Sequence, residues 1–161
     1  SLKTGGADDG VILVAPRDGD SEMIVQVSST SGETIAVDVT VYTPEALDFV
    51  VNTSGGDLNL SGMTGNGTAN TGDGDCTIDM DLGTAGDLTV VTGQGDVSIT
   101  VPAATKGAVT ATAQGGTVTI DGDLNFDSMI VMGNATGNIN GGGEVDITVT
   151  TGGGNIALNG K

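Results

Sequence analysis

Residues 87–107 read DLTVVTGQGDVSITVPAATKG, and this stretch decides the fold. It holds two runs of alternating apolar and polar residues, with the glycine-rich turn Thr92–Asp96 between them. Alternation with a period of two is typical of strands that bury one face. The stretch therefore predicts a strand, a turn, a second strand and a short return. The same plan occurs before and after it, which indicates an internal repeat.

Six copies of the turn align when the residue that follows the glycines is taken as an anchor. The anchors are Asp57, Asp75, Asp96, Thr117, Asn138 and Asn155, at steps of 18, 21, 21, 21 and 17 residues. Four residues before them stand Thr53, Thr71, Thr92, Ala113, Asn134 and Thr151. The corner keeps its length, and only the return side varies. This is typical of stacked repeats, which tolerate insertions on one side.

Apolar residues recur in columns on both sides of the corner. The column after the anchor is Leu58, Cys76, Val97, Val118, Ile139 and Ile156. The two columns before the turn are Phe49, Gly67, Leu88, Val109, Ile130 and Ile147, and then Val51, Ala69, Val90, Ala111, Met132 and Val149. A lone repeat cannot bury such a face, but stacked neighbours can. We predict an all-β, single-domain, right-handed parallel β-solenoid with coils of about 21 residues and almost no helix.

The whole chain, residues 1–161, is long enough for one domain. We expect regular coils over 47–161 and irregular N-terminal strands or a cap over 1–46. Within that N-terminal part, Val11–Ala15, Met23–Ser28 and Ile35–Val41 are predicted strands. They form either irregular first coils or an antiparallel hairpin that caps the stack, and we expect the irregular coils.

The C-terminal corner, Gly152–Leu158, is complete, and no polar capping repeat follows it before Lys161. An end coil without a cap leaves an open β edge. We therefore expect the C-terminal coil to be the open end of the stack. Either the natural chain continues beyond it, or self-association occurs through this end coil.

The chain has 21 acidic and 4 basic residues, which gives a net charge of −17. Such a surface repels nucleic acid, whose binders need Lys and Arg patches, and it disfavours anionic membranes. No apolar run approaches membrane-spanning length, so we expect no membrane insertion. The single cysteine, Cys76, falls in an inward column and is interpreted as a small core residue.

The sequence contains no histidine, so Ser-His-Asp and Cys-His arrangements are impossible within it. Some β-solenoids cut acidic polysaccharides with clustered carboxylates, basic residues and aromatic platforms. Carboxylate pairs exist here at Asp79/Asp81 and Asp121/Asp123, but such pairs at strand ends are more often solvated turns. We expect no enzyme and no catalytic residues, and the alternative is a polysaccharide-acting enzyme on a β-helix.

Asp73, Asp75 and Asp96 fall near one stacked corner, and hard cations such as Ca²⁺ want several oxygen ligands. The segment DGDC lacks EF-hand spacing, and the calcium-binding repeat GGxGxD is not reproduced. Two interpretations stay open. The three residues form either structural Asx-type turns that bond nearby backbone N–H groups or a calcium site. We expect the turns, and no other cofactor is predicted.

A third possible role comes from an outward column, which is Thr68, Thr89, Thr110, Val131 and Thr148. Ice-binding solenoids present threonine ladders on a flat face. Here Val131 interrupts the ladder, and exposed threonine is ordinary on strands. An ice-binding solenoid with a Thr ladder is therefore kept only as a further alternative.

The segment Val41–Glu45, VYTPE, precedes serial glycine-corner coils such as TSGGDLNL, TGQGDVSI and TGGGNIAL. Together they resemble the bacterial putative-adhesin family with the toast-rack β-solenoid fold, over roughly residues 20–161. The corners Ala113–Thr117 and Asn134–Asn138 depart from the pattern. The resemblance implies an exported, extracellular or cell-envelope protein whose signal peptide has been removed, and it supplies no catalytic residues. We expect a non-enzymatic adhesin or interaction scaffold with a protein or glycan partner.

Overall fold

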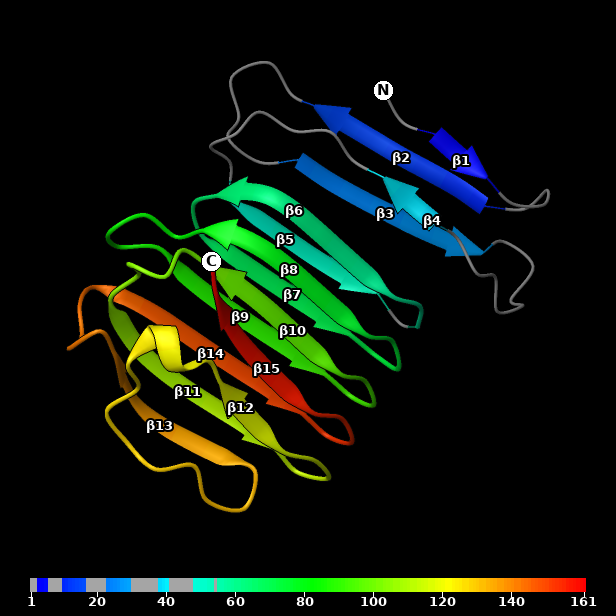
Figure 1. The fold of residues 1–161 in the computed structure, drawn as a ribbon. Coiled ribbons are helices and arrows are strands. Elements are labelled where there is room, and N and C mark those ends of the chain that lie inside the picture. The colour runs from blue at the N-terminus through cyan, green and yellow to red at the C-terminus, as the bar shows by residue number, and fades with distance from the viewer. Residues whose placement is uncertain (1–2, 6–9, 17–22, 30–37, 41–47, 54) are drawn as a thin grey trace.

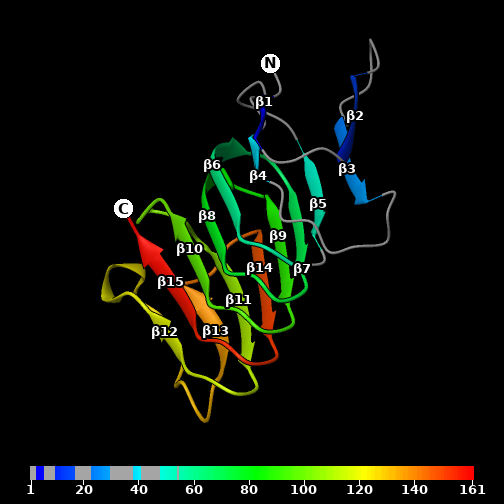
Figure 2. The same ribbon diagram turned by 90° about the vertical axis from the view of Figure 1, so that its right-hand side faces the viewer.

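The computed structural model describes residues 3–5, 10–16, 23–29, 38–40, 48–53 and 55–161. Two sheets of mainly parallel strands face each other and are built up coil by coil (Figures 1 and 2). Their inward side chains form one apolar core. This confirms an all-β fold with stacked parallel sheets, and the 3₁₀ turn η1 (Gly122–Leu124) is the one helical element of the described residues.

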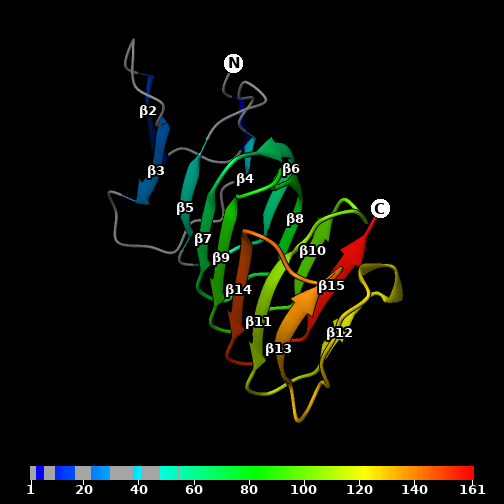
Figure 3. The same cartoon turned by 90° about the vertical axis from the view of Figure 1, so that its left-hand side faces the viewer.

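Figure 3 shows the strands of the six-stranded sheet side by side. Their order across that sheet is β5 (Phe49–Thr53), β7 (Gly67–Thr71), β9 (Asp87–Thr92), β14 (Val145–Thr151), β11 (Gly107–Ala113) and β13 (Asn134–Ile139). The order across the five-stranded sheet is β6 (Leu58–Thr64), β8 (Cys76–Asp81), β10 (Val97–Val101), β15 (Ile156–Gly160) and β12 (Val118–Ile120).

The first three coils, β5/β6, β7/β8 and β9/β10, stack in the order of the sequence. Phe49 pairs with Gly67, which in turn pairs with Leu88, as the predicted column requires. Position 67 requires glycine, because a Cβ there would lie 2.3 Å from the Phe49 ring. The Phe49 ring of the preceding coil thus fills the space that a side chain at position 67 would occupy.

After β10 the order of the stack departs from the order of the chain. β14 lies between β9 and β11, and β15 lies between β10 and β12 (Figure 1). The prediction that the C-terminal coil is the open end of the stack is therefore wrong, because both of its strands are paired on both sides. Self-association through this coil stays a prediction, but it cannot use an open edge there.

The fifth predicted coil does not form, and residues 134–138 make a strand where a corner was expected. β13 runs antiparallel to β11, with Ala111 opposite Ala135. Ile130 and Met132, which were expected inside, are 41% and 94% exposed. The physical reason is the chain reversal at Met132 and Gly133, whose φ angles are 48° and 75°. A chain that reverses here cannot supply the parallel strand of another coil.

Residues 121–139 instead cover the far end of the core. Leu124 of η1 is fully buried, and Phe126 packs against the core cluster. Gly137 allows close approach of this segment, since a Cβ there would lie 2.5 Å from the Ser128 Cβ and 3.0 Å from the Phe126 ring. The end of the stack next to β12 and β13 therefore has an apolar cover.

The described N-terminal strands form antiparallel pairs. β2 (Gly10–Pro16) pairs with β3 (Met23–Ser29), and β1 (Lys3–Gly5) pairs with β4 (Asp38–Thr40). The predicted strands Val11–Ala15 and Met23–Ser28 are confirmed, but the expectation of irregular coils is wrong. The link between β2 and β3 is too short for the crossover that parallel neighbours need. Most of Ile35–Val41 and all of VYTPE lie outside the described residues.

Candidate interaction surfaces

The anchor residues form a hydrogen-bonded ladder along one edge of the stack. The backbone N–H of Asp75 donates to Asp57 Oδ1 at 3.0 Å, and that of Asp96 donates to Asp75 Oδ1 at 2.9 Å. The N–H of Asn155 then donates to Asp96 Oδ1 at 2.7 Å, and that of Thr117 donates to Asn155 Oδ1 at 3.0 Å. The ladder follows the order of the stack and joins five coils without a break.

Glycine precedes each anchor because the coils approach closely at this corner. A Cβ on Gly95 would lie 2.1 Å from the Gly74 carbonyl oxygen, and one on Gly154 would lie 1.9 Å from the Gly95 oxygen. Thr151, which is buried beside them, donates its hydroxyl to the Gly95 oxygen at 2.9 Å and accepts the Gly154 N–H at 3.0 Å. The repeated Thr-x-x-Gly-Asx corner therefore allows the coils to stack closely.

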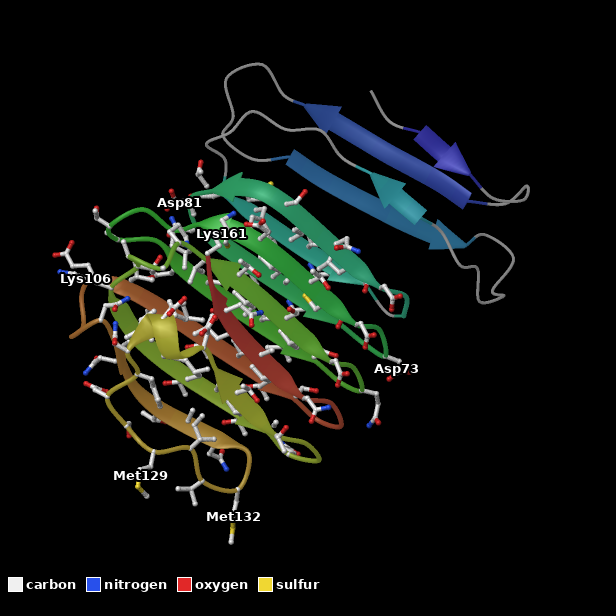
Figure 4. The ribbon with its side chains drawn as sticks, viewed as in Figure 1. Asp73, Asp81, Lys106, Met129, Met132 and Lys161 are labelled. Atoms are coloured by element: carbon white, nitrogen blue, oxygen red, sulfur yellow. The ribbon has the colours of Figure 1, made fainter. Side chains whose placement is uncertain are left out.

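The three calcium candidates lie at this corner with different roles. Asp75 and Asp96 each accept a backbone N–H of the next coil on Oδ1, whereas the turn interpretation expected a partner within their own turn. Asp73 is exposed at the tip of the β7–β8 corner (Figure 4). Within residues 48–53 and 55–161 and the described N-terminal strands, no three acidic or Cys side chains are grouped to hold a metal. Calcium binding at this corner stays a prediction.

The carboxylate pairs considered for hydrolysis have local partners. Asp79 forms an ion pair with Lys161, and Asp81 Oδ1 accepts the Gly83 N–H at 2.8 Å. Asp121 caps η1, and its Oδ1 accepts the Asp123 N–H at 3.2 Å. The contacts of Asp81 and Asp121 are those of a turn and a cap, whereas Asp79 pairs with a residue 82 positions away in the sequence.

The outward threonine column is continuous in the folded stack. Register pairs align Thr68, Thr89, Thr148, Thr110 and Thr136 on neighbouring strands. The parallel outward column beside it is Asn70, Val91, Thr150, Thr112 and Asn134. We call these two columns the threonine face. Val131 does not interrupt it, because β13 supplies Thr136 at that place, and none of its ten residues is charged.

Residues Met129–Met132 form an exposed segment that we call the apolar tip. Their exposed fractions are 77%, 41%, 51% and 94%. In Figure 4 the side chains of Met129 and Met132 project from the end of the molecule beyond β13. The sequence signal is the apolar run within SMIVMG, residues 128–133, which does not alternate as the strands of the repeat do.

The apolar tip is held by hydrogen bonds. Val131 and Asn134 exchange two backbone N–H···O bonds of 2.9 Å, and the Asn134 side-chain amide donates to the Met132 carbonyl at 3.1 Å. The Ala113 N–H donates to the Gly133 oxygen at 2.7 Å and ties the turn to β11. A positive φ at Met132 is uncommon for a residue other than glycine, and such strain clusters at functional sites.

Asp127 closes the other half of the β13 edge. Its N–H donates to the Asn138 oxygen at 3.0 Å, and its Oδ1 and Oδ2 accept the Asn138 N–H and amide at 2.6 and 3.0 Å. These hydrogen bonds from Asn138 lower the pKa of Asp127. With both ends of β13 occupied by this segment, the edge is a poor template for adding another strand.

Cys76 lies in the core as expected. It is fully buried, and burial raises the pKa of its thiol to about 11. A thiol in this state is a weak nucleophile, because the reactive form is the thiolate. Its role is that of a small apolar residue between Leu58 and Val97.

Comparisons with known proteins give two findings. The profile of the family described as Toastrack DUF4097 matches residues 11–159. A putative cell adhesion protein from Clostridium sporogenes ATCC 15579 has a similar crystal structure, with a TM-score of 0.54 and 14% sequence identity. The match covers 94% of this chain and 76% of that one, and it shows a shared fold. No curated protein matches the sequence. Among the described residues, no helix is long and apolar enough to cross a membrane.

Proposed function

We propose, from the premise that the chain belongs to the Toastrack DUF4097 family of adhesin-like toast-rack proteins, that it is a non-enzymatic adhesin or interaction scaffold. The proposal places it outside the cell or in the cell envelope, with coils that wind right-handed. Its partner is a protein or a glycan surface, and neither nucleic acid binding nor membrane insertion is part of the role.

The observation that carries this proposal is the apolar tip. Exposed apolar clusters on soluble domains mark sites of protein contact, and methionine adapts its shape to varied partners. This cluster stands on a chain with a net charge of −17. Burying one such side chain in a partner contributes roughly 1.5–3 kcal/mol. The hydrogen bonds that hold the turn reduce the ordering cost of binding.

The experiment is a binding measurement on arrayed surface glycans and extracellular-matrix proteins. The chain is displayed on beads, and bead retention is compared with that of a Met129→Ser/Met132→Ser variant. The matched control is Val50→Ser/Val91→Ser, which removes two exposed valines outside the tip. We expect the tip variant to lose at least about tenfold in affinity on spots that retain the wild type, since contact residues of this kind cost over about 1 kcal/mol each.

Two results would contradict the proposal. Equal retention of the wild type and the tip variant would remove the tip from the binding surface. Release of reducing ends from an acidic polysaccharide by the purified chain would favour the polysaccharide-acting enzyme instead. In that case Asp121 and Asp123 would be the first residues to replace by mutation in a search for the catalytic carboxylates.

A second candidate function is ice binding, and the continuous threonine face favours it. Neighbouring strands repeat about every 4.8 Å, so the face presents its hydroxyl groups at a regular spacing. The test is thermal hysteresis of the wild type, of Thr110→Asp on the threonine face, and of Thr77→Asp on the other sheet. Ice binding requires hysteresis in the wild type that Thr110→Asp abolishes and Thr77→Asp keeps. A wild type without hysteresis excludes it.

A further inference from the structure

The C-terminal strand pair, β14 and β15 with their corner, fills a slot between coils that are already complete without it. β14 pairs with β9 on one side and β11 on the other, and β15 does the same with β10 and β12. The pair is also buried, since Ile147 and Ile156 are almost inaccessible to solvent. In this arrangement the insert is the partner of one edge of each of the four strands β9, β10, β11 and β12.

Residues 140–143, which link β13 to the insert, can change their backbone conformation. Asn140, Gly141 and Gly142 all have positive φ, at 50°, 82° and 81°. A Cβ on Gly143 would lie 2.4 Å from the Lys106 carbonyl oxygen, so the link passes tightly over the β10–β11 connection. Glycine adopts other backbone conformations at little cost, which makes 141–143 a hinge.

The contacts within the slot do not depend on which molecule supplies the insert. The Asn155 side chain accepts the Thr117 N–H, and the Asn155 N–H donates to Asp96. Both hydrogen bonds can form whether Asn155 belongs to the same molecule or to a second one. Exchange of an identical element keeps every contact except those of the hinge, so it is a route to dimers with a small free-energy cost.

Charge also permits the exchange. Residues 143–161 carry two acidic side chains, Glu144 and Asp146, and one basic side chain, Lys161. The net charge of the insert is therefore −1, against −17 for the whole chain. A second copy can present this segment to the slot with far less repulsion than docking of two surfaces would meet.

We propose that β14 and β15 exchange between two copies of the chain, and that the partner of the slot is the C-terminal strand pair of a second copy. While the chain folds, the slot stays open until residues 145–160 arrive. At low protein concentration the insert of the same chain fills it, because a short tether gives an effective concentration of order mM. At high concentration the insert of a neighbour competes for the slot.

Cysteine cross-linking across β10 and β15 tests this exchange on the full chain. Ser98 and Ala157 are register partners. Parallel neighbours lie about 4.8 Å apart, within the Cα range of a disulfide. A mixture of Ser98→Cys and Ala157→Cys chains is unfolded, refolded at high concentration under reducing conditions and then oxidised. We expect a disulfide-linked dimer of two 15.7 kDa chains.

Three controls make the result decisive. Each single variant refolded alone should give several-fold less dimer, because exchange then brings no two new cysteines together. The double variant in one chain should close its disulfide at low concentration, which shows that the geometry permits the bond. If the double variant closes and the mixture gives no more dimer than the single variants, exchange does not occur.

A change in the hinge gives a second, independent readout. Deleting Gly142 shortens the tether, and we expect the dimer fraction measured by light scattering to rise several-fold. Inserting two glycines at the same place should return the chain to the monomer. A folded, monomeric deletion variant at all concentrations would contradict the proposal.

Discussion

The first three coils and the rest of the stack use the same corner motif but differ in how the chain visits them. In the first three, ladder partners are 18 and 21 residues apart in sequence. Beyond them, Asp96 and Asn155 are 59 residues apart, and Asn155 and Thr117 are 38 apart. The hydrogen bonds are 2.9–3.0 Å long in the first three coils and 2.7–3.0 Å long beyond them. A corner of this type therefore fits on any other corner, and the motif alone does not fix the order of stacking.

One segment of the chain does not form a coil, and it closes one end of the stack. Residues 121–139 contain the capped turn η1, the apolar tip and a strand that runs the wrong way for a coil. This segment covers the end of the core, so no further coil can be added there. The last repeat, β14/β15, lies between β9/β10 and β11/β12 and not at this end.

The largest expected effect comes from a charge in the shared core. Ile99 in β10 and Ile147 in β14 are both fully buried, one in each region. We expect Ile99→Asp and Ile147→Asp each to abolish cooperative folding, because burying an unpaired carboxyl costs several kcal/mol and a domain is stabilised by only roughly 5–15 kcal/mol. Thermal unfolding by circular dichroism measures this. Thr119→Asp, at an exposed site of β12, is the control and should unfold like the wild type.

A difference between Ile99→Asp and Ile147→Asp would be informative. If Ile147→Asp leaves a cooperative transition and Ile99→Asp does not, the first three coils fold without the insert. In that case the two regions would be separate cooperative units. Loss of the transition in both variants would indicate that the insert completes a single unit.

The next effect is steric and tests the close approach of the corners. Gly154→Ala would place a methyl group 1.9 Å from the Gly95 oxygen, and Gly95→Ala would place one 2.1 Å from the Gly74 oxygen. We expect each to lower the free energy of unfolding by about 1–3 kcal/mol, as overpacking does. Urea denaturation measures the loss. Gly55→Ala meets nothing within 4 Å, and a shift as large as that of Gly154→Ala would refute the steric account.

The sequence pattern predicts well whether a residue faces the core or the solvent. It predicts poorly which coil lies next to which. The period of two identifies Cys76, Leu88 and Val97 as inward, and they are. It cannot tell which coil lies next to which, because every corner offers the same donors and acceptors. It also fails at Asn138, where Gly137 before it and Ile139 after it imitate a corner. There the same residues serve an edge strand that needs Gly137 for close packing.

A smaller effect concerns the ladder itself. Asn155 bonds both neighbouring anchors, whereas Asp57 at the first coil accepts a single N–H from Asp75. We expect Asn155→Ala to cost about 1–3 kcal/mol and Asp57→Ala about 0.5–1.5 kcal/mol, because more hydrogen bonds are lost in the inserted coil. Chemical denaturation of both variants provides the comparison. Equal losses would mean that the ladder is no more important at the insert than at the first coil.

The smallest effect is the pH dependence that Asp127 gives to the end cover. Its pKa is lowered in the folded protein by the hydrogen bonds from Asn138. A carboxyl whose folded pKa is depressed contributes stability that is present above its unfolded pKa and is lost as pH falls through the folded value. We expect the melting temperature of Asp127→Asn to lie slightly below that of the wild type at pH 7. The two should converge as the wild-type carboxylate is protonated in acid. Asp73→Asn, at an exposed corner of the first three coils, is the control that separates this local effect from the general loss of charge. A gap between Asp127→Asn and the wild type that stays constant from pH 7 into acid would assign the effect to shape and not to charge.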